Sequence, residues 1–230
     1  MRNPWLLGAA LLLAGCGALP GFTPPHTQVA APVKDLTPAG QVSLYLAAVD
    51  GLVKQQRYGA ALAFLDRYAV DGRNPEPRYW LLRGDALLGC KRIPEALGAD
   101  GKLSATALAA QGWNGQGRAL AAARDWRGAE ADFRQAVRSD PANADFLNNL
   151  AYAGLHVGAR ADAVTELRQA RELDPRSVLV RDNLFIALAL QRDRAGAQAI
   201  LADIADGAKR EKIRTTLEAL LPGFTPEGKS

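Results

Sequence analysis

The sequence predicts an all-helical protein made of stacked helix pairs, and three observations lead to this fold class. Residues 134–141 (Arg-Gln-Ala-Val-Arg-Ser-Asp-Pro) return as residues 168–175 (Arg-Gln-Ala-Arg-Glu-Leu-Asp-Pro), thirty-four positions later. Apolar residues recur at i, i+3 and i+4, the spacing of one helix face, as at Leu147, Leu150 and Ala151. The chain is 48% hydrophobic, so its 230 residues can bury a sizeable core. A fixed period of this length indicates a repeat architecture.

Each repeat unit is expected to form two helices joined by a short turn. Ala163, Leu167 and Ala170 give the second helix of one unit an apolar face. Gly158 begins the turn before that helix, and Pro175 ends the unit because proline lacks the N–H that would continue a helix. Two such helices cannot bury their apolar faces alone, whereas stacked copies form a solenoid with a continuous core.

The unit at residues 110–143 resembles the tetratricopeptide repeat. That family places a large and then a small residue in the first helix, and Ala, a large residue, Ala and Pro in the second. The resemblance implies a right-handed superhelical solenoid of about five helix pairs with a C-terminal capping helix. The residues expected to pack the helices together are Trp80, Gly84, Ala96, Trp113, Gly117, Ala129, Phe133, Ala136, Ala151, Ala163, Leu167 and Ala170.

The repeat domain is expected at residues 38–221, beginning at Thr37-Pro38, which has the pattern of a helix N-cap followed by proline at the first helical position. A helix at residues 208–221 would cap the array, and residues 222–230 would form a loose tail. The five units are expected to start near residue 42, near Pro77, at residue 110, at residue 144 and at Val178.

Two positions depart from the repeat pattern. Asp100 stands where a large apolar residue is expected, and a tolerant surface turn is favoured there over a functional departure. Phe185 stands where the repeat usually carries Gly or Ala, so it must push the helices apart or rotate them. Cys90 follows a helical pattern and is expected to be a small buried residue rather than a reactive thiol.

The first residues have the pattern of a bacterial lipoprotein signal. Arg2 is followed by a short apolar run and then by Leu13-Ala14-Gly15-Cys16. This resemblance implies that residues 1–15 are removed and that Cys16 is lipidated; the alternative is an ordinary secretory signal with an accidental cysteine. Residues 16–37 are then a proline-interrupted tether. In lipoproteins of this kind the residue after the cysteine often decides sorting, so the resemblance implies that Gly17, which is not Asp, directs the protein to the outer membrane if the source has one, with the domain facing the periplasm.

The sequence contains no motif of an enzyme active site and no charge pattern of a nucleic-acid-binding protein. We find no His-Glu-x-x-His, Gly-x-Ser-x-Gly or Walker motif, and the only histidines are His26 and His156. No metal site, cofactor or catalytic group is therefore expected. The formal net charge of +4 is mild and has no clustered basic run, which argues against a nucleic-acid partner.

Protein binding through a concave groove is what the repeat resemblance implies. In such arrays the first helices of successive units line the groove. Asparagines there could grip the backbone of a peptide, and Tyr152 and Arg118 could serve as anchors. The alternative is that these are only polar positions on an exposed helix face. Carried over by position, the candidate groove residues are Asn114, Arg118, Asp145, Asn148, Asn149, Tyr152, His156 and Asn183.

Residues 40–215 are similar to the TadD family, the lipoprotein of the tight-adherence (Flp) pilus secretion system. The stretch at residues 182–190 is like the Asn-Leu-Ala-Leu-Ala-Leu stretch of that family, although Phe185 interrupts it. The resemblance implies a pilotin-like adaptor that assembles or localises an outer-membrane secretin. The alternatives are a type IV pilus pilotin, a scaffold lipoprotein of cell-envelope synthesis or of outer-membrane protein insertion, and, more remotely, an enzyme subunit.

Overall fold

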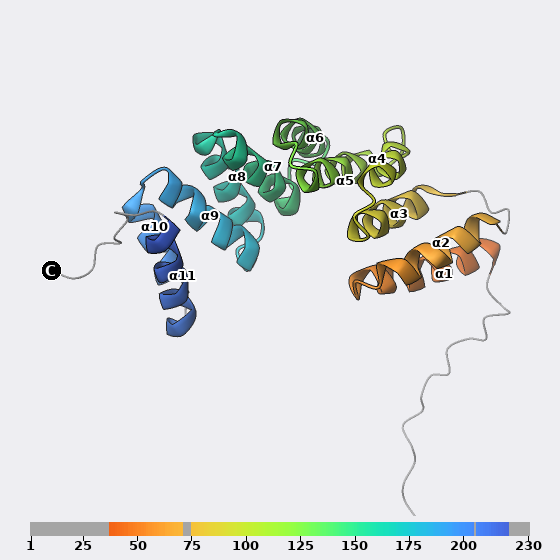
Figure 1. The fold of residues 1–230 in the computed structure, drawn as a ribbon, viewed down its shortest axis with the longest axis horizontal. Helices are drawn as coiled ribbons and strands as arrows, with labels where there is room; N and C mark the ends of the chain where they lie inside the picture. Colours follow the sequence, from red (N-terminus) through yellow and green to blue (C-terminus); the bar gives the residue numbers. More distant parts are fainter. Residues whose placement is uncertain (1–36, 71–74, 205, 221–230) are drawn as a thin grey trace, which may run out of the picture. The chain divides into compact units, whose positions relative to one another are not determined.

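A computed structural model describes residues 37–70, 75–204 and 206–220 of the chain, which are helices and short connections without a strand. The chain divides into a unit of residues 1–41 and a unit of residues 42–230. The helices of the described part, labelled in Figure 1, are α1 (Pro38–Lys54), α2 (Tyr58–Val70), α3 (Pro77–Gly89), α4 (Ile93–Gly101), α5 (Ala109–Ala122), α6 (Trp126–Ser139), α7 (Ala144–Val157), α8 (Arg160–Leu173), α9 (Val178–Leu190), α10 (Arg194–Ala202) and α11 (Gly207–Leu220).

From α3 to α10 the helices pack in consecutive pairs. Each helix contacts the next one along the chain, and the first helices of neighbouring pairs also touch: α3 with α5, α5 with α7, and α7 with α9. This is the connectivity of a helical-repeat solenoid, in which each unit contacts its neighbours. The predicted all-helical solenoid of helix pairs is confirmed.

The turn inside each pair repeats the same backbone geometry. One residue in it has a positive φ, at Gln56, Lys91, Arg124, Gly158 and Arg192. Side-chain caps recur as well, because Asp125 accepts from the Gly128 N–H at 3.0 Å and Asp193 accepts from the Gly196 N–H at 2.9 Å. Such caps satisfy backbone donors that have no partner inside the helix.

Thr37 caps the first described helix, as its sequence pattern predicts. Its Oγ1 accepts a hydrogen bond from the Gly40 N–H at 3.2 Å, and Pro38 is the first residue of α1. Proline is well placed there because the first N–H groups of a helix have no partner within it.

Three core clusters run through the pairs. The N-terminal cluster lies between α1 and α5 and includes Leu65, Tyr68 and Leu87, each at most 2% exposed. A small central cluster is built around Phe133 and Leu150. The C-terminal cluster joins α7 to α10 and extends to α11, whose Ile213 packs against it. Its buried members from the second half of the array include Leu167, Leu184, Phe185, Leu188 and Leu201.

Small residues set the distance between paired helices. A Cβ placed on Gly117 of α5 would lie 2.6 Å from the Cδ1 of Phe133 on α6, so no larger residue fits without movement. Among the residues proposed above as packing positions, Trp80 and Trp113 are partly exposed. The others are buried: Gly84, Ala96, Gly117, Ala129, Phe133, Ala136, Ala151, Ala163, Leu167 and Ala170.

Three local expectations need correction or sharpening. Asp100 is not on a surface turn; it is only 2% exposed and lies within α4. Cys90 is exposed rather than buried, because it follows the last residue of α3 at the turn. Phe185 is 3% exposed and joins the C-terminal cluster, so its bulk serves as core.

Several expectations concern residues that lie wholly or mostly outside the described ones. These are the signal peptide at residues 1–15, the lipid site at Cys16, the tether at residues 16–37 and the tail at residues 222–230. Among the described helices, none combines the length and the apolar character that crossing a membrane requires.

Candidate protein-interaction groove

Asparagine pairs connect the first helices of neighbouring units. The Nδ2 of Asn149 on α7 donates to the Oδ1 of Asn114 on α5 at 2.9 Å. The Nδ2 of Asn183 on α9 donates to the Oδ1 of Asn148 on α7 at 2.8 Å. Each pair is a side-chain rung between two stacked units, so these amides help to fix the register of α5, α7 and α9.

The second rung changes the role expected for two of the asparagines. Asn148 is 3% exposed and Asn183 is 8% exposed, so neither presents its amide on an open groove surface. Burial of an amide is costly unless it is hydrogen-bonded, and this bond gives the Asn183 Nδ2 and the Asn148 Oδ1 a partner. Asn114 and Asn149 are half-buried and remain at the edge of accessible surface. The expectation of freely available groove amides is therefore wrong for Asn148 and Asn183.

Arg118 is exposed on α5 and is engaged by the preceding unit. Its Nη1 lies 2.6 Å from the Oδ1 of Asp85 on α3. An ion pair with this much solvent exposure contributes about 0–1 kcal/mol. Its guanidinium can therefore exchange Asp85 for a partner at modest cost.

An acidic side chain is buried close to this pair. Asp100 lies between α3 and α5, where its carboxyl group fills the space that a Cβ on Gly84 or Gly115 would occupy. Burial, and after it the negative charge of Asp85, raises the pKa of Asp100 to about 8, and Arg118 opposes the shift. The carboxyl group is thus neutral over much of the physiological range.

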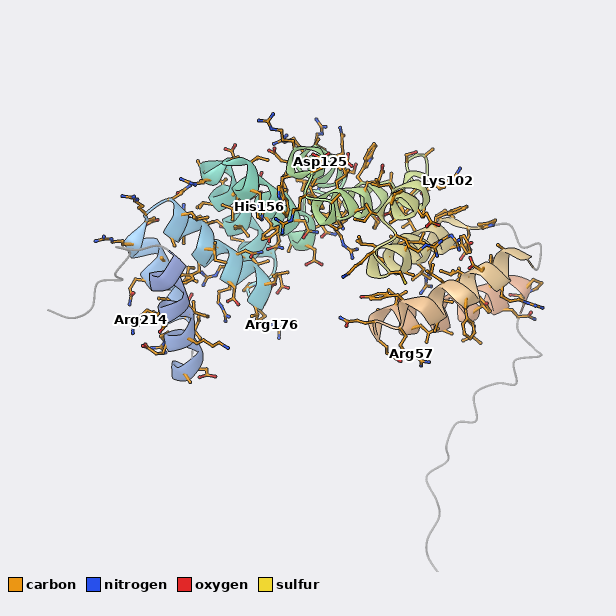
Figure 2. All side chains as sticks on the ribbon, in the orientation of Figure 1. Arg57, Lys102, Asp125, His156, Arg176 and Arg214 are labelled. Carbon is orange, nitrogen blue, oxygen red and sulfur yellow. The ribbon has the colours of Figure 1, made fainter. Side chains whose placement is uncertain are left out.

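Three aromatic side chains meet where α6 begins and α7 ends. The rings of Trp126 and His156 stack with centroids 3.7 Å apart and an interplanar angle of 6°. Tyr152 packs edge-on against both, with its centroid 5.8 Å from that of Trp126 and 4.9 Å from that of His156. His156, labelled in Figure 2, is exposed, and Tyr152 is 43% exposed. We call Trp126, Tyr152 and His156 the aromatic cluster.

Trp126 was missed by the sequence reasoning. The groove positions carried over from the repeat all lie on first helices, whereas Trp126 is the first residue of the second helix α6. A signal was present, because the residue one period later is Arg160 and an aromatic residue is not needed there for the fold.

An apolar strip continues from the aromatic cluster onto α9. Ile186 is 41% exposed and stands one period after Tyr152 on the neighbouring first helix. Leu179 is 58% exposed and lies seven residues before Ile186, which is two turns along the same helix face. We call Tyr152, Leu179 and Ile186 the apolar strip.

Charged groups border this strip. Asp145 of α7 is exposed, and Asp182 of α9 is paired with Arg181, whose Nη2 lies 2.6 Å from the Asp182 Oδ1. The described residues contain no group of three or more His, Cys, Asp or Glu side chains placed to hold a metal ion. The arrangement offers contact area, amides and aromatic faces, which are the means of binding a polypeptide.

The comparisons with known proteins agree with this class of protein. A tetratricopeptide-repeat family model matches residues 114–178. The TPR repeat-containing protein PA4299 of Pseudomonas aeruginosa is 32% identical over 197 residues, which is 84% of this chain and 74% of that protein. The chain belongs to the tetratricopeptide-repeat family.

Solved structures share the fold. TTC0263, a tetratricopeptide-repeat protein of Thermus thermophilus, has a TM-score of 0.63 at 21% identity, covering 78% of this chain and 98% of its own. PilF of Pseudomonas aeruginosa has a TM-score of 0.64 at 15% identity, with coverage of 77% and 83%. YrrB, described as a tetratricopeptide-repeat protein with an unusual peptide-binding site, has a TM-score of 0.53 at 18% identity, with coverage of 76% and 89%.

Proposed function

We propose that this protein is a lipid-anchored periplasmic adaptor that binds a protein partner through the first-helix face of its repeats. The observation that carries the proposal is the apolar strip, which meets the aromatic cluster at Tyr152. Large side chains that stay exposed together on neighbouring helices mark interaction surfaces. A peptide-binding site in the related fold of YrrB supports the same use of this one.

The partner we propose is an outer-membrane secretin of a tight-adherence (Flp) pilus secretion system. The support is the resemblance of residues 40–215 to the TadD family, together with the lipoprotein pattern that ends at Cys16. In this role the groove holds a segment of the secretin while the lipid carries the pair to the outer membrane. A type IV pilus pilotin and a scaffold lipoprotein of cell-envelope synthesis or outer-membrane protein insertion are the alternatives.

The lipid anchor is tested at Cys16. Replacing Cys16 by Ser removes the sulfur that would carry the acyl chains, and stable anchoring needs more than one such chain. We expect Cys16→Ser to lose palmitate labelling and to leave the outer-membrane fraction, with an unchanged circular dichroism spectrum. Cys90→Ser is the matched control, because it removes the other cysteine. Equal labelling of Cys16→Ser and the wild type would exclude the anchor.

The groove is tested by a charge placed on the apolar strip. Ile186→Asp puts an unpaired carboxylate where an apolar contact is proposed, so we expect at least a tenfold lower recovery of the secretin with the detergent-solubilised lipoprotein. Phe64→Asp is the control, because Phe64 is a comparably exposed residue (48%) on α2, the second helix of its pair. Equal recovery with both variants would contradict the groove, and recovery of envelope hydrolases or insertase components instead would contradict the secretin.

A further inference from the structure

A six-residue sequence occurs twice, on either side of the repeat domain. Residues 19–24 and residues 221–226 both read Leu-Pro-Gly-Phe-Thr-Pro. Neither copy belongs to the thirty-four-residue period, and the helices between them contain no third copy. The repeat pattern of the solenoid does not require these two segments to be identical. We therefore interpret the hexapeptide as a motif that is recognised as a ligand.

The chemistry of the hexapeptide is that of a groove ligand. It carries no charged residue, and Leu and Phe supply apolar anchors. Each proline has a fixed φ and restricts the residue before it to extended conformations. Proline-flanked peptides of this kind lose little freedom on binding and dock in grooves lined by aromatic side chains.

The aromatic cluster and the apolar strip form a surface whose chemistry is complementary to that of the hexapeptide. The aromatic cluster presents ring faces, and the apolar strip presents the side chains of Leu179 and Ile186. Of the large exposed hydrophobic residues in the described part, five fall within the stretch from Tyr152 to Ile186, and only Leu44 and Phe64 lie elsewhere. The half-buried amides of Asn114 and Asn149 on the adjoining helices can serve the backbone of an extended peptide.

The second copy begins at the residue after α11. Residue 221 follows directly on α11, and Ile213 of α11 packs on the C-terminal core cluster. The same cluster contains Leu184 and Leu188 of α9, the helix that carries Leu179 and Ile186. A ligand in the same chain as its binding surface has an effective concentration in the millimolar range when a short flexible linker spans the distance, so weak intrinsic affinity is then enough for occupancy.

We propose that residues 221–226 dock on the surface formed by the aromatic cluster and the apolar strip of the same chain, with Phe224 as the anchor. This inference rests on the groove of the proposed function but needs no secretin. A partner enters by displacing the hexapeptide, so it must present an uncharged, proline-flanked segment with an aromatic anchor.

The test uses the full chain in detergent and a fluorescein-labelled peptide with the sequence of residues 18–25. We expect the Phe22→Ala, Phe224→Ala double variant to bind the peptide at least tenfold more tightly than the wild type, whose surface is already occupied. Adding Ile186→Asp to the double variant should abolish binding, whereas adding Phe64→Asp should not. A peptide with Ala in place of Phe should fail to bind in every case.

Three results would overturn the inference. They are no binding to the double variant, equal binding to the wild type and the double variant, and binding that survives Ile186→Asp. If Ile186→Asp lowers the melting temperature, Leu179→Ser and Tyr152→Ala provide the same test. A dimer in sedimentation that dissociates on Phe224→Ala would overturn docking within one chain. Loss of self-docking with secretin capture intact would leave the proposed function standing.

Discussion

The side chain of Asp100 can be buried because two residues that face it are glycines without a side chain. A Cβ on Gly84 would lie 2.1 Å from its Oδ1, and a Cβ on Gly115 would lie 2.5 Å from its Cγ. Glycine on both flanking first helices therefore makes room for the carboxyl group in the core. The cost of burying a charge there is avoided by protonation, because the pKa is raised to about 8 by burial.

The protonation of Asp100 should make stability depend on pH. Its pKa is about 8 in the folded chain and near 3.8 in the unfolded chain, so between these values the folded state binds more protons and stability falls as pH rises. Asp100→Asn removes this titration. We expect the variant to gain stability relative to the wild type as pH rises from about 5 to about 8.5, measured by denaturant unfolding. A constant difference between the two proteins at all pH values would contradict the buried, neutral carboxyl group.

At the same scale, only part of the candidate groove could be predicted from the sequence. Asparagines recur on the first helices, and this pattern predicted a groove lined with amides. They could not indicate that Asn148 bonds Asn183 and leaves the surface, because the bonded residues are one position out of step with the period. Trp126 lay outside the positions expected to line a groove, and the repeat pattern does not specify that its ring stacks on that of His156.

At the scale of the helix pair, side-chain volume at one position decides the packing. In the pair of α5 and α6, Gly117→Ala would put a Cβ against the ring of Phe133, and overpacking of this kind costs about 1–3 kcal/mol. We expect that loss in the free energy of unfolding. Gly98→Ala on α4 is the matched control, because no atom lies within 4 Å of its added Cβ. It should stabilise the chain by about 0.5–1 kcal/mol, since alanine is the better helix former. Equal effects would mean that the α5–α6 contact is misplaced.

At the scale of the whole molecule, the fold was predictable because the same sequence pattern recurs in successive units. The period of thirty-four residues and the closing proline agree between the units at residues 110–143 and 144–177, and small residues recur at helix contacts in most units. The departures at Asp100 and Cys90 were misjudged because each is a single exception, and its outcome depends on neighbours that the pattern does not specify. Asp100 is buried because of the glycines opposite it, and Cys90 is exposed because α3 ends just before it.

Because the core is divided into separate clusters, we expect a destabilising substitution to affect mainly the helices that contribute to its own cluster. Leu167 belongs to the C-terminal cluster and Leu87 to the N-terminal one. Truncating either buried leucine to Ala should cost about 2–5 kcal/mol. Because repeat stability is a sum of unit and nearest-neighbour terms, amide hydrogen exchange should rise mainly in α7 to α10 for Leu167→Ala and in α2 to α4 for Leu87→Ala. Uniform loss of protection in both variants would contradict this division.

The central claim is that the surface containing Tyr152 holds the partner while the chain is anchored at the membrane. In-cell photo-crosslinking with a benzophenone amino acid at position 152 tests it most directly, with the same probe at position 64 as the control. We expect a lipid-dependent crosslink to an outer-membrane secretin from position 152, lost in the Cys16→Ser background, and none from position 64. No secretin crosslink from position 152, or equal crosslinks from both positions, would contradict it.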